Sequence, residues 1–112
     1  MTVLANAQEH FKSKLAGGLQ KITVSEWKTD IYFKKAYPFA VEQKIISLQQ
    51  EGKTVDALVE TLLQKALDPD GKPLFTKFDR TTLMHDVDPS VIINICAQIN
   101  NPIDSVEDIV KN

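Results

Sequence analysis

The side chains with the greatest chemical reactivity in this sequence are one cysteine, Cys96, and two histidines, His10 and His85. A cysteine activated by a histidine is a nucleophile, and the two residues need not be neighbours in the sequence. Cys96, however, stands among isoleucines, which predicts a buried thiol that acts as a small apolar side chain. A zinc site needs three or four closely spaced ligands, and these residues do not supply them. We therefore predict no catalytic residue and no bound metal.

A second pattern, Asp68-Pro69-Asp70-Gly71, resembles part of a calcium-binding loop. Such a loop carries acids at its first, third and fifth positions, glycine at the sixth and glutamate at the twelfth. Here glycine already stands at the fourth position, and the twelfth position is Asp79. Because Asp, Pro and Gly are typical turn residues, a turn that ends a helix explains the pattern better.

The charges of the chain do not favour a nucleic-acid-binding protein. The 112 residues carry 13 Lys and Arg against 15 Asp and Glu, a formal net charge of −2. The small basic clusters Lys12/Lys14 and Lys34-Lys35 are predicted to be solvated surface, although a local basic patch stays open as an alternative. The glycines form no phosphate-binding loop, and no cofactor is predicted.

The length and composition predict one domain, residues 1–112, in the cytoplasm. With 43% hydrophobic and 25% charged residues, the chain is typical of a soluble globular domain. A single cysteine permits no internal disulfide, which fits a reducing compartment. No apolar stretch approaches the roughly 18 residues of a membrane span, and the start of the chain lacks a secretory signal. Membrane contact is therefore not expected.

Residue periodicity predicts an N-terminal helix followed by a β-hairpin. One apolar stripe runs along this helix and consists of Leu4, Ala7, Phe11 and Leu15. Gly17-Gly18 follows and is predicted to end the helix. β-Branched and aromatic residues then predict strands at 19–24 and 28–34. A hairpin alone is marginal in water, so it must pack on helices, with Trp27 and Tyr32 as anchors.

The rest of the chain predicts four or five short helices, which makes the fold class α+β and mostly α. The first runs from 39 to 50, and the second follows Thr54 as its N-cap. The second helix carries a stripe predicted to face the core, namely Val55, Leu58, Val59, Leu62, Leu63 and Ala66. Asp79 is predicted to cap a third helix, and Asp88-Pro89 a fourth that runs to about residue 98. The broad apolar face of the fourth predicts the most buried element.

The last dozen residues, 101–112, permit two interpretations. Asn101-Pro102 repeats the signal for a helix start, and four apolar residues follow at near-helical spacing: Ile103, Val106, Ile109 and Val110. The segment is either a final short helix or a mobile C-terminal tail that becomes ordered on a partner. Both interpretations stay open.

Four phrases of the sequence follow one another in the order seen in a known family. They are LAGGLQKITVSEW at 15–27, DIYFK at 30–34 with Tyr37-Pro38-Phe39, LLQKALDPDGKPLF at 62–75, and DRTTL at 79–83 with DPSVI at 88–92. Together they resemble the tail assembly chaperones of long-tailed bacteriophages, over roughly residues 15–99. One difference is that the family often has threonine after the proline, where this chain has Phe39.

The resemblance implies a non-enzymatic viral protein in the cytoplasm of the infected bacterial host. Such a chaperone binds the tape measure protein, keeps it soluble while the tail tube assembles, and is absent from the mature virion. Many of these chaperones also have a longer form made by a translational frameshift. The tail tube protein is a second candidate partner, and self-association is expected because a long partner needs many copies.

The predicted partner contacts are the apolar side chains of the first helix and of the final segment. They are Leu4, Phe11, Leu15, Ile103, Val106, Ile109 and Val110. Such stripes suit binding between amphipathic helices. For both sets, packing on the protein's own core is an equal alternative.

Two other functions are consistent with the same sequence. A minor structural tail protein would remain in the purified particle, where a chaperone would not be found. A small nucleic-acid-binding regulator would form a complex whose affinity falls with salt. An enzyme ranks last, because no constellation of reactive residues is present.

Overall fold

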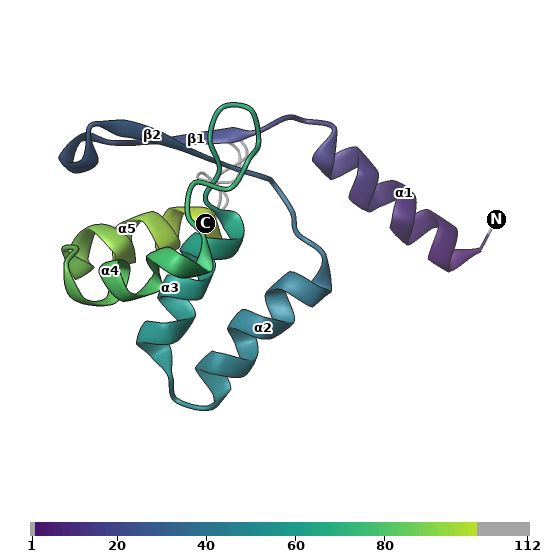
Figure 1. Ribbon diagram of the computed structural model, residues 1–112. Helices are drawn as coiled ribbons and strands as arrows, with labels where there is room; N and C mark the ends of the chain where they lie inside the picture. Colours follow the sequence, from purple (N-terminus) through teal and green to yellow (C-terminus); the bar gives the residue numbers. More distant parts are fainter. Residues whose placement is uncertain (1, 101–112) are drawn as a thin grey trace, which may run out of the picture.

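The protein folds into α-helices and one small hairpin that lies along one side of the helical body, as Figure 1 shows in a computed structural model that describes residues 2–100. The α-helices are α1 (Val3–Leu15), α2 (Phe39–Gln50), α3 (Thr54–Lys65), α4 (Arg80–His85) and α5 (Pro89–Asn100). The strands are β1 (Gln20–Val24) and β2 (Thr29–Phe33). The predicted α+β, mostly α fold class is confirmed. The segment 101–112, with its two interpretations, lies outside the described residues.

The hairpin is antiparallel and buries one face. Ile22 pairs with Ile31 in the register, and alternate residues on both strands face the core. A short 3-10 turn, Ser25–Trp27, joins the strands. The Trp27 ring meets Phe75 edge-on, with 6.4 Å between ring centroids. Trp27 is thus one of the side chains that hold the hairpin on the helices, as predicted.

A backbone bridge attaches the hairpin to the end of α3. The Tyr32 N–H donates to the Leu67 carbonyl at 2.9 Å, and the Leu67 N–H donates to the Tyr32 carbonyl at 2.7 Å. The turn after Leu67 is the predicted one, since the Asp68 Oδ1 accepts from the N–H groups of Asp70 and Lys72. This carboxylate therefore serves the turn.

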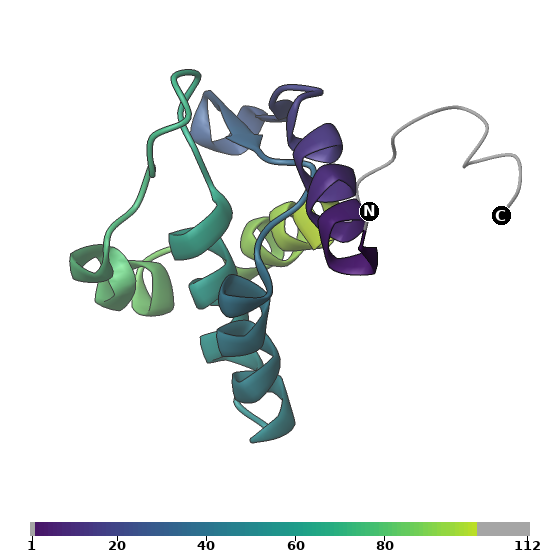
Figure 2. The same cartoon turned by 90° about the vertical axis from the view of Figure 1, so that its right-hand side faces the viewer.

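Helix α3 lies at the centre of the fold, in contact with α2, α4 and α5 (Figures 1 and 2). It buries six residues, including Glu60, Thr61 and Lys65, whereas α5 buries five. The prediction that α5 is the most buried element was therefore wrong. Three neighbouring helices cover α3, so even charged side chains on it lose contact with solvent.

The predicted helix caps are correct in one case and differ in two. The Asp88 Oδ1 accepts from the Ser90 N–H at 3.0 Å and caps α5 as predicted. Thr54 is the first residue of α3 rather than its N-cap. The Asp79 carboxylate makes no cap bond to α4; it accepts from the Thr76 N–H in the capping box of a 3-10 turn, Lys77–Asp79. Asp79, which was predicted to cap a helix, thus caps a 3-10 turn instead.

Helix α1 projects from the body of the molecule (Figures 1 and 2). None of its residues is buried, and it ends before Gly18, whose φ of +84° is the left-handed conformation that glycine adopts readily. The Thr2 Oγ1 caps its start by accepting from the Ala5 N–H at 3.1 Å. The helix is therefore well capped at its start but gains little from tertiary packing.

Candidate partner-binding surfaces

Helix α1 exposes the apolar stripe that the sequence predicts as a partner contact. Leu4, Phe11 and Leu15, the α1 stripe, fall within about 40° of one another around the helix and extend over roughly 16 Å along it. Leu4 is 71% exposed, Leu15 is exposed and Phe11 is half-buried. The protein's own core does not cover this stripe. The other predicted contacts, Ile103, Val106, Ile109 and Val110, lie outside the described residues.

A second apolar surface is a groove between α3, α4 and α5. This apolar groove has a volume of about 350 Å³ and is lined by Val55, Leu58, Val59, Leu83, Met84, His85, Val87, Pro89, Ile92 and Ile93. Val55 and Ile93 are 58% and 53% exposed. Exposed apolar side chains beside a hollow are typical of a surface that receives another apolar group.

The sequence did not predict the apolar groove. Val55 was expected to face the core and Ile93 to belong to the buried face of its helix, and both expectations were wrong. Helix α4 has only six residues and is too short to cover the line where α3 and α5 meet. The sequence feature that could have predicted the apolar groove is the wide apolar arc of α5. One short helix such as α4 covers only part of an arc of this width.

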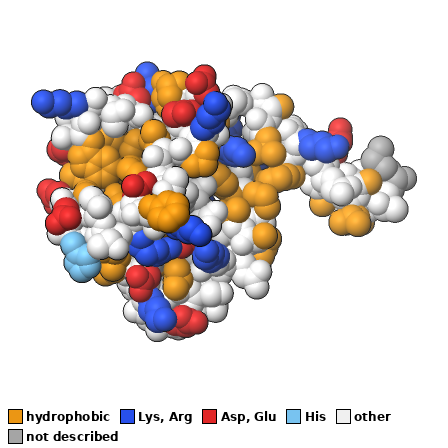
Figure 3. All heavy atoms as spheres, in the orientation of Figure 1, with side chains coloured by type: hydrophobic (Ala, Val, Ile, Leu, Met, Phe, Trp, Pro, Cys, Tyr) orange, Lys and Arg blue, Asp and Glu red, His pale blue; other side chains and the backbone are white. Residues whose placement is uncertain are grey.

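Figure 3 shows how apolar side chains reach the surface on one face of the molecule. Orange side chains gather over the left part of the body and reappear on the projecting α1, while charges of both signs are spread over the rest. The visible surface is therefore mixed and carries no extended basic region.

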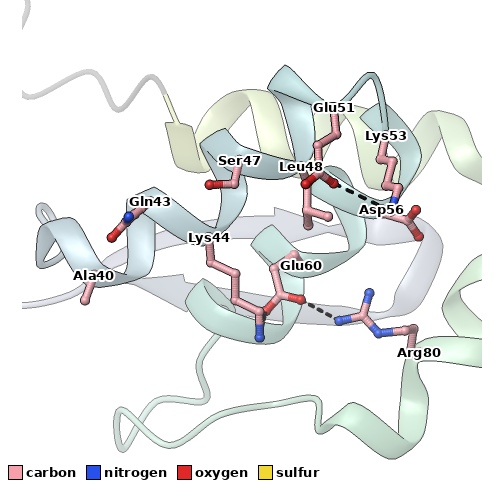
Figure 4. Close-up of a pocket in the computed structure, with 10 residues that line it drawn as sticks. All are labelled: Ala40, Gln43, Lys44, Ser47, Leu48, Glu51, Lys53, Asp56, Glu60 and Arg80. Carbon is pink, nitrogen blue, oxygen red and sulfur yellow. Dashed lines mark hydrogen bonds and ion pairs between the residues drawn. The ribbon is translucent and has the colours of Figure 1, made fainter.

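A charged groove of about 540 Å³ lies between α2, α3 and α4 (Figure 4). At its base Glu60, only 2% exposed, forms ion pairs with Lys44 and Arg80 and accepts from the Gln64 amide at 2.8 Å. Figure 4 shows the Lys44 and Arg80 side chains converging on Glu60 from different elements. These contacts link α2 and the start of α4 to α3.

The electrostatics of Glu60 favour a structural role. Burial raises its pKa, but the hydrogen bonds from Gln64 and Arg80 and the charge of Lys44 outweigh burial and leave the pKa below its usual value. A general acid or base would need a pKa shifted towards neutrality. In residues 2–100, moreover, every buried side-chain nitrogen and oxygen has a hydrogen-bond partner.

Lys65 is a second buried charge, at the junction of α2, α3 and α5. Its ammonium group pairs with Glu42, donates to the Asn100 Oδ1 at 3.2 Å and lies 5.0 Å from the centroid of the Tyr37 ring. The Tyr37 hydroxyl donates to the Lys65 carbonyl at 3.0 Å and accepts from the Lys34 N–H. Burial raises the pKa of this tyrosine. The cluster fixes the connection between β2 and α2.

The residues considered for chemistry do not form a reactive site. Cys96 is buried, donates to the Leu58 carbonyl at 3.3 Å, and burial raises the pKa of its thiol to about 12. At neutral pH almost no thiolate forms, so this cysteine is a poor nucleophile. His10 and His85 are exposed on separate helices. Across the described residues, no group of three His, Cys, Asp or Glu is arranged to hold a metal.

Comparisons with known protein families, curated proteins and solved structures give no match for this chain. Between residues 2 and 100 no helix has the length and apolar character needed to cross a bilayer. The features that bear on function are therefore the apolar groove, the α1 stripe and the family-like phrases of the sequence.

Proposed function

We propose that the protein is a tail assembly chaperone of a long-tailed bacteriophage, which binds the tape measure protein and keeps it soluble during tail tube assembly. It would act in the cytoplasm of the infected bacterial host and be absent from the mature virion. Two features support this proposal: the ordered phrases between residues 15 and 99, and the presence of uncovered apolar helix surfaces. The tail tube protein is a second proposed partner.

The observation that carries the proposal is the apolar groove with its exposed residues Val55 and Ile93. A tape measure protein is largely helical, and an amphipathic helix presents apolar side chains at i, i+3, i+4 and i+7. Such a row fits a groove formed by three helices. The α1 stripe offers a further apolar contact, so Leu4, Phe11 and Leu15 stay predicted partner contacts.

Binding of many copies to one partner chain provides the affinity that a single groove lacks. One groove buries little area and binds weakly, which suits a partner that must later be released. Many copies bound along one long tape measure chain raise the overall affinity. When the copies are linked to one another, a bound copy keeps its neighbour close to the next binding segment of that chain. The proposed mechanism is thus reversible coverage of apolar helix faces.

Ile93→Glu tests this proposal. The substitution places a charge in the apolar groove, and the loss of one buried isoleucine contact costs about 1.5–3 kcal/mol. We expect roughly tenfold more of this variant than of the unmodified protein to be needed to keep tape measure fragments in solution. Light scattering of purified fragments mixed with increasing amounts of each protein measures the effect.

The matched control is Phe39→Glu, which introduces the same charge at an exposed apolar position outside the groove. It should protect the fragments as well as the unmodified protein does. If the unmodified protein leaves every fragment as aggregated as before, the proposed function is wrong. If Ile93→Glu protects fully, the groove is not the binding surface.

A further inference from the structure

Four lysines from two separate parts of the sequence lie near the place where α1 joins the body. Lys12 and Lys14 belong to the last turn of α1, and Lys34 and Lys35 follow β2. The Lys35 side chain packs against Gly17, since a Cβ atom on this glycine would lie 2.8 Å from the Lys35 Nζ. Gly17 comes two residues after α1, so Lys12 and Lys14 lie within about 8 Å of it along the helix axis. These four lysines form the neck patch.

The described chain does not neutralise the neck patch. Among residues 2–100, none of its four lysines takes part in an ion pair. The two nearest acids are engaged or isolated, because Glu42 pairs with the buried Lys65 and Glu9 is the single acid of α1. Positive charges held close together repel one another and attract an anionic group. The neck patch therefore favours an acidic occupant.

A hollow connects the neck patch to the end of α5. Its volume is about 190 Å³, and Lys34 and Lys35 line it together with Ile99 and Asn100. Asn100 is the last residue of α5 and the last one that the structure describes. The chain that follows Asn100 therefore starts beside two lysines of the patch.

That following segment, residues 101–112, has the opposite charge. It contains Asp104, Glu107 and Asp108 but only one base, Lys111. Three of the 15 acidic residues and one of the 13 basic residues of the chain thus lie in it, which leaves 12 of each in residues 1–100. The formal net charge of −2 comes entirely from this segment.

We propose that the acidic side chains of residues 101–112 bind to the neck patch of the same molecule. Asp104 follows Asn100 by four residues, which span at most about 14 Å when extended, so it can reach the lysines of the hollow. Glu107 and Asp108 follow by seven and eight residues and can reach the end of α1. Charge, position and chain length thus select the same occupant.

The short connection makes weak interactions sufficient. Exposed ion pairs are individually weak and are screened by salt. A segment attached a few residues away, however, has a high effective concentration at the patch, and its acidic side chains act together. Because the patch includes residues of α1 and of the β2–α2 connection, the bound segment would tie α1 to the body. Helix α1 has no buried residue of its own, so this contact would restrict its position (Figure 1).

This contact goes beyond the proposed function and is independent of it. It uses neither the apolar groove nor a tape measure fragment. Its absence would leave fragment binding at the groove unaffected, and a failure to bind fragments would leave the contact intact.

Paramagnetic NMR of the full chain with a nitroxide at Asn112→Cys tests the contact. Cys96 stays unlabelled, because it is buried and its thiol has a pKa of about 12. At low ionic strength the nitroxide should broaden the amide signals of the neck patch. The broadening should be lost in about 1 M NaCl, where charges are screened beyond roughly 3 Å. It should also be lost when the acids are neutralised by Asp104→Asn, Glu107→Gln and Asp108→Asn.

Charge exchange distinguishes ion pairing from the mere proximity of an attached segment. Lys34→Glu/Lys35→Glu should abolish the broadening at these two positions, and the further changes Asp104→Lys/Glu107→Lys should restore it. The matched control is Lys53→Glu/Lys77→Glu, which makes the same change at two exposed lysines outside the patch and should leave the broadening intact. The salt and neutralisation experiments alter nothing in residues 1–100, so they stand even if a lysine variant does not fold.

Four results would overturn the proposed contact. The first is the absence of broadening at low salt, and the second is broadening that persists after neutralisation of the three acids. The third is equal broadening of an unlabelled ¹⁵N chain by a spin-labelled chain mixed with it, since the segment would then reach a neighbouring copy. The fourth is a patch that ignores neutralisation of the segment but shifts its signals on addition of a short single-stranded RNA, as expected of a nucleic-acid site.

Discussion

Replacement of Leu62 by alanine should lower the free energy of unfolding by about 2–5 kcal/mol. Leu62 is fully buried on α3, in a core that joins the hairpin to α5. Removing its terminal carbons forfeits their burial and leaves a cavity that a close-packed interior refills only in part. For a domain of this size, such a loss is a large fraction of the total stability. Urea unfolding followed by circular dichroism measures it.

Leu4→Ala is the matched control, with the same chemical change on the exposed α1 stripe. It should change the free energy of unfolding by less than about 0.5 kcal/mol, because the side chain has almost no contacts to lose. Equal destabilisation by both variants would mean that α1 packs on the body in solution, contrary to the structure.

The second large effect concerns the buried ammonium group of Lys65. Glu42→Ala removes its ion-pair partner and should cost roughly 3 kcal/mol, since a buried charge is left without its counter-charge. Lys65→Met keeps an unbranched side chain but removes the charge, so it should cost far less. Thermal or urea unfolding of both variants gives the comparison.

The double variant Glu42→Ala/Lys65→Met distinguishes charge from packing. When Lys65 is already methionine, the loss of Glu42 should have little further effect, so the two changes are strongly non-additive. Additive costs would show that the Glu42 side chain contributes through packing alone. Glu51→Ala, which breaks an exposed ion pair with Lys53, provides the control and should be nearly neutral.

Local sequence patterns predicted the elements well. The helix at 39–50 has the predicted ends, and both strands lie within one residue of their predicted bounds. The signals used were the spacing of apolar residues, the presence of turn residues and the presence of β-branched residues. Each signal extends over only a few positions, so it can be recognised in a single sequence. The Asp88 cap and the Asp68 turn belong to the same class of local signal.

Which side chains are buried by other helices could not be predicted in the same way. Val55 and Ile93 have apolar patterns like those of core residues, yet they are exposed beside the short helix α4. Glu60 and Lys65 are buried because side chains from other helices neutralise them, and nothing near them in the sequence indicates those partners. The apolar groove depends on such contacts between residues that are far apart in the sequence, whereas the α1 stripe could be identified from the sequence alone.

We propose that the apolar groove between α3, α4 and α5 binds an amphipathic helix of the tape measure protein. Methyl NMR of the unmodified protein, titrated with a soluble tape measure fragment, is the measurement that tests this binding site. We expect the methyl signals of Val55 and Ile93 to shift progressively while that of buried Ile31 stays in place. Unchanged Val55 and Ile93 signals at saturating fragment would contradict it.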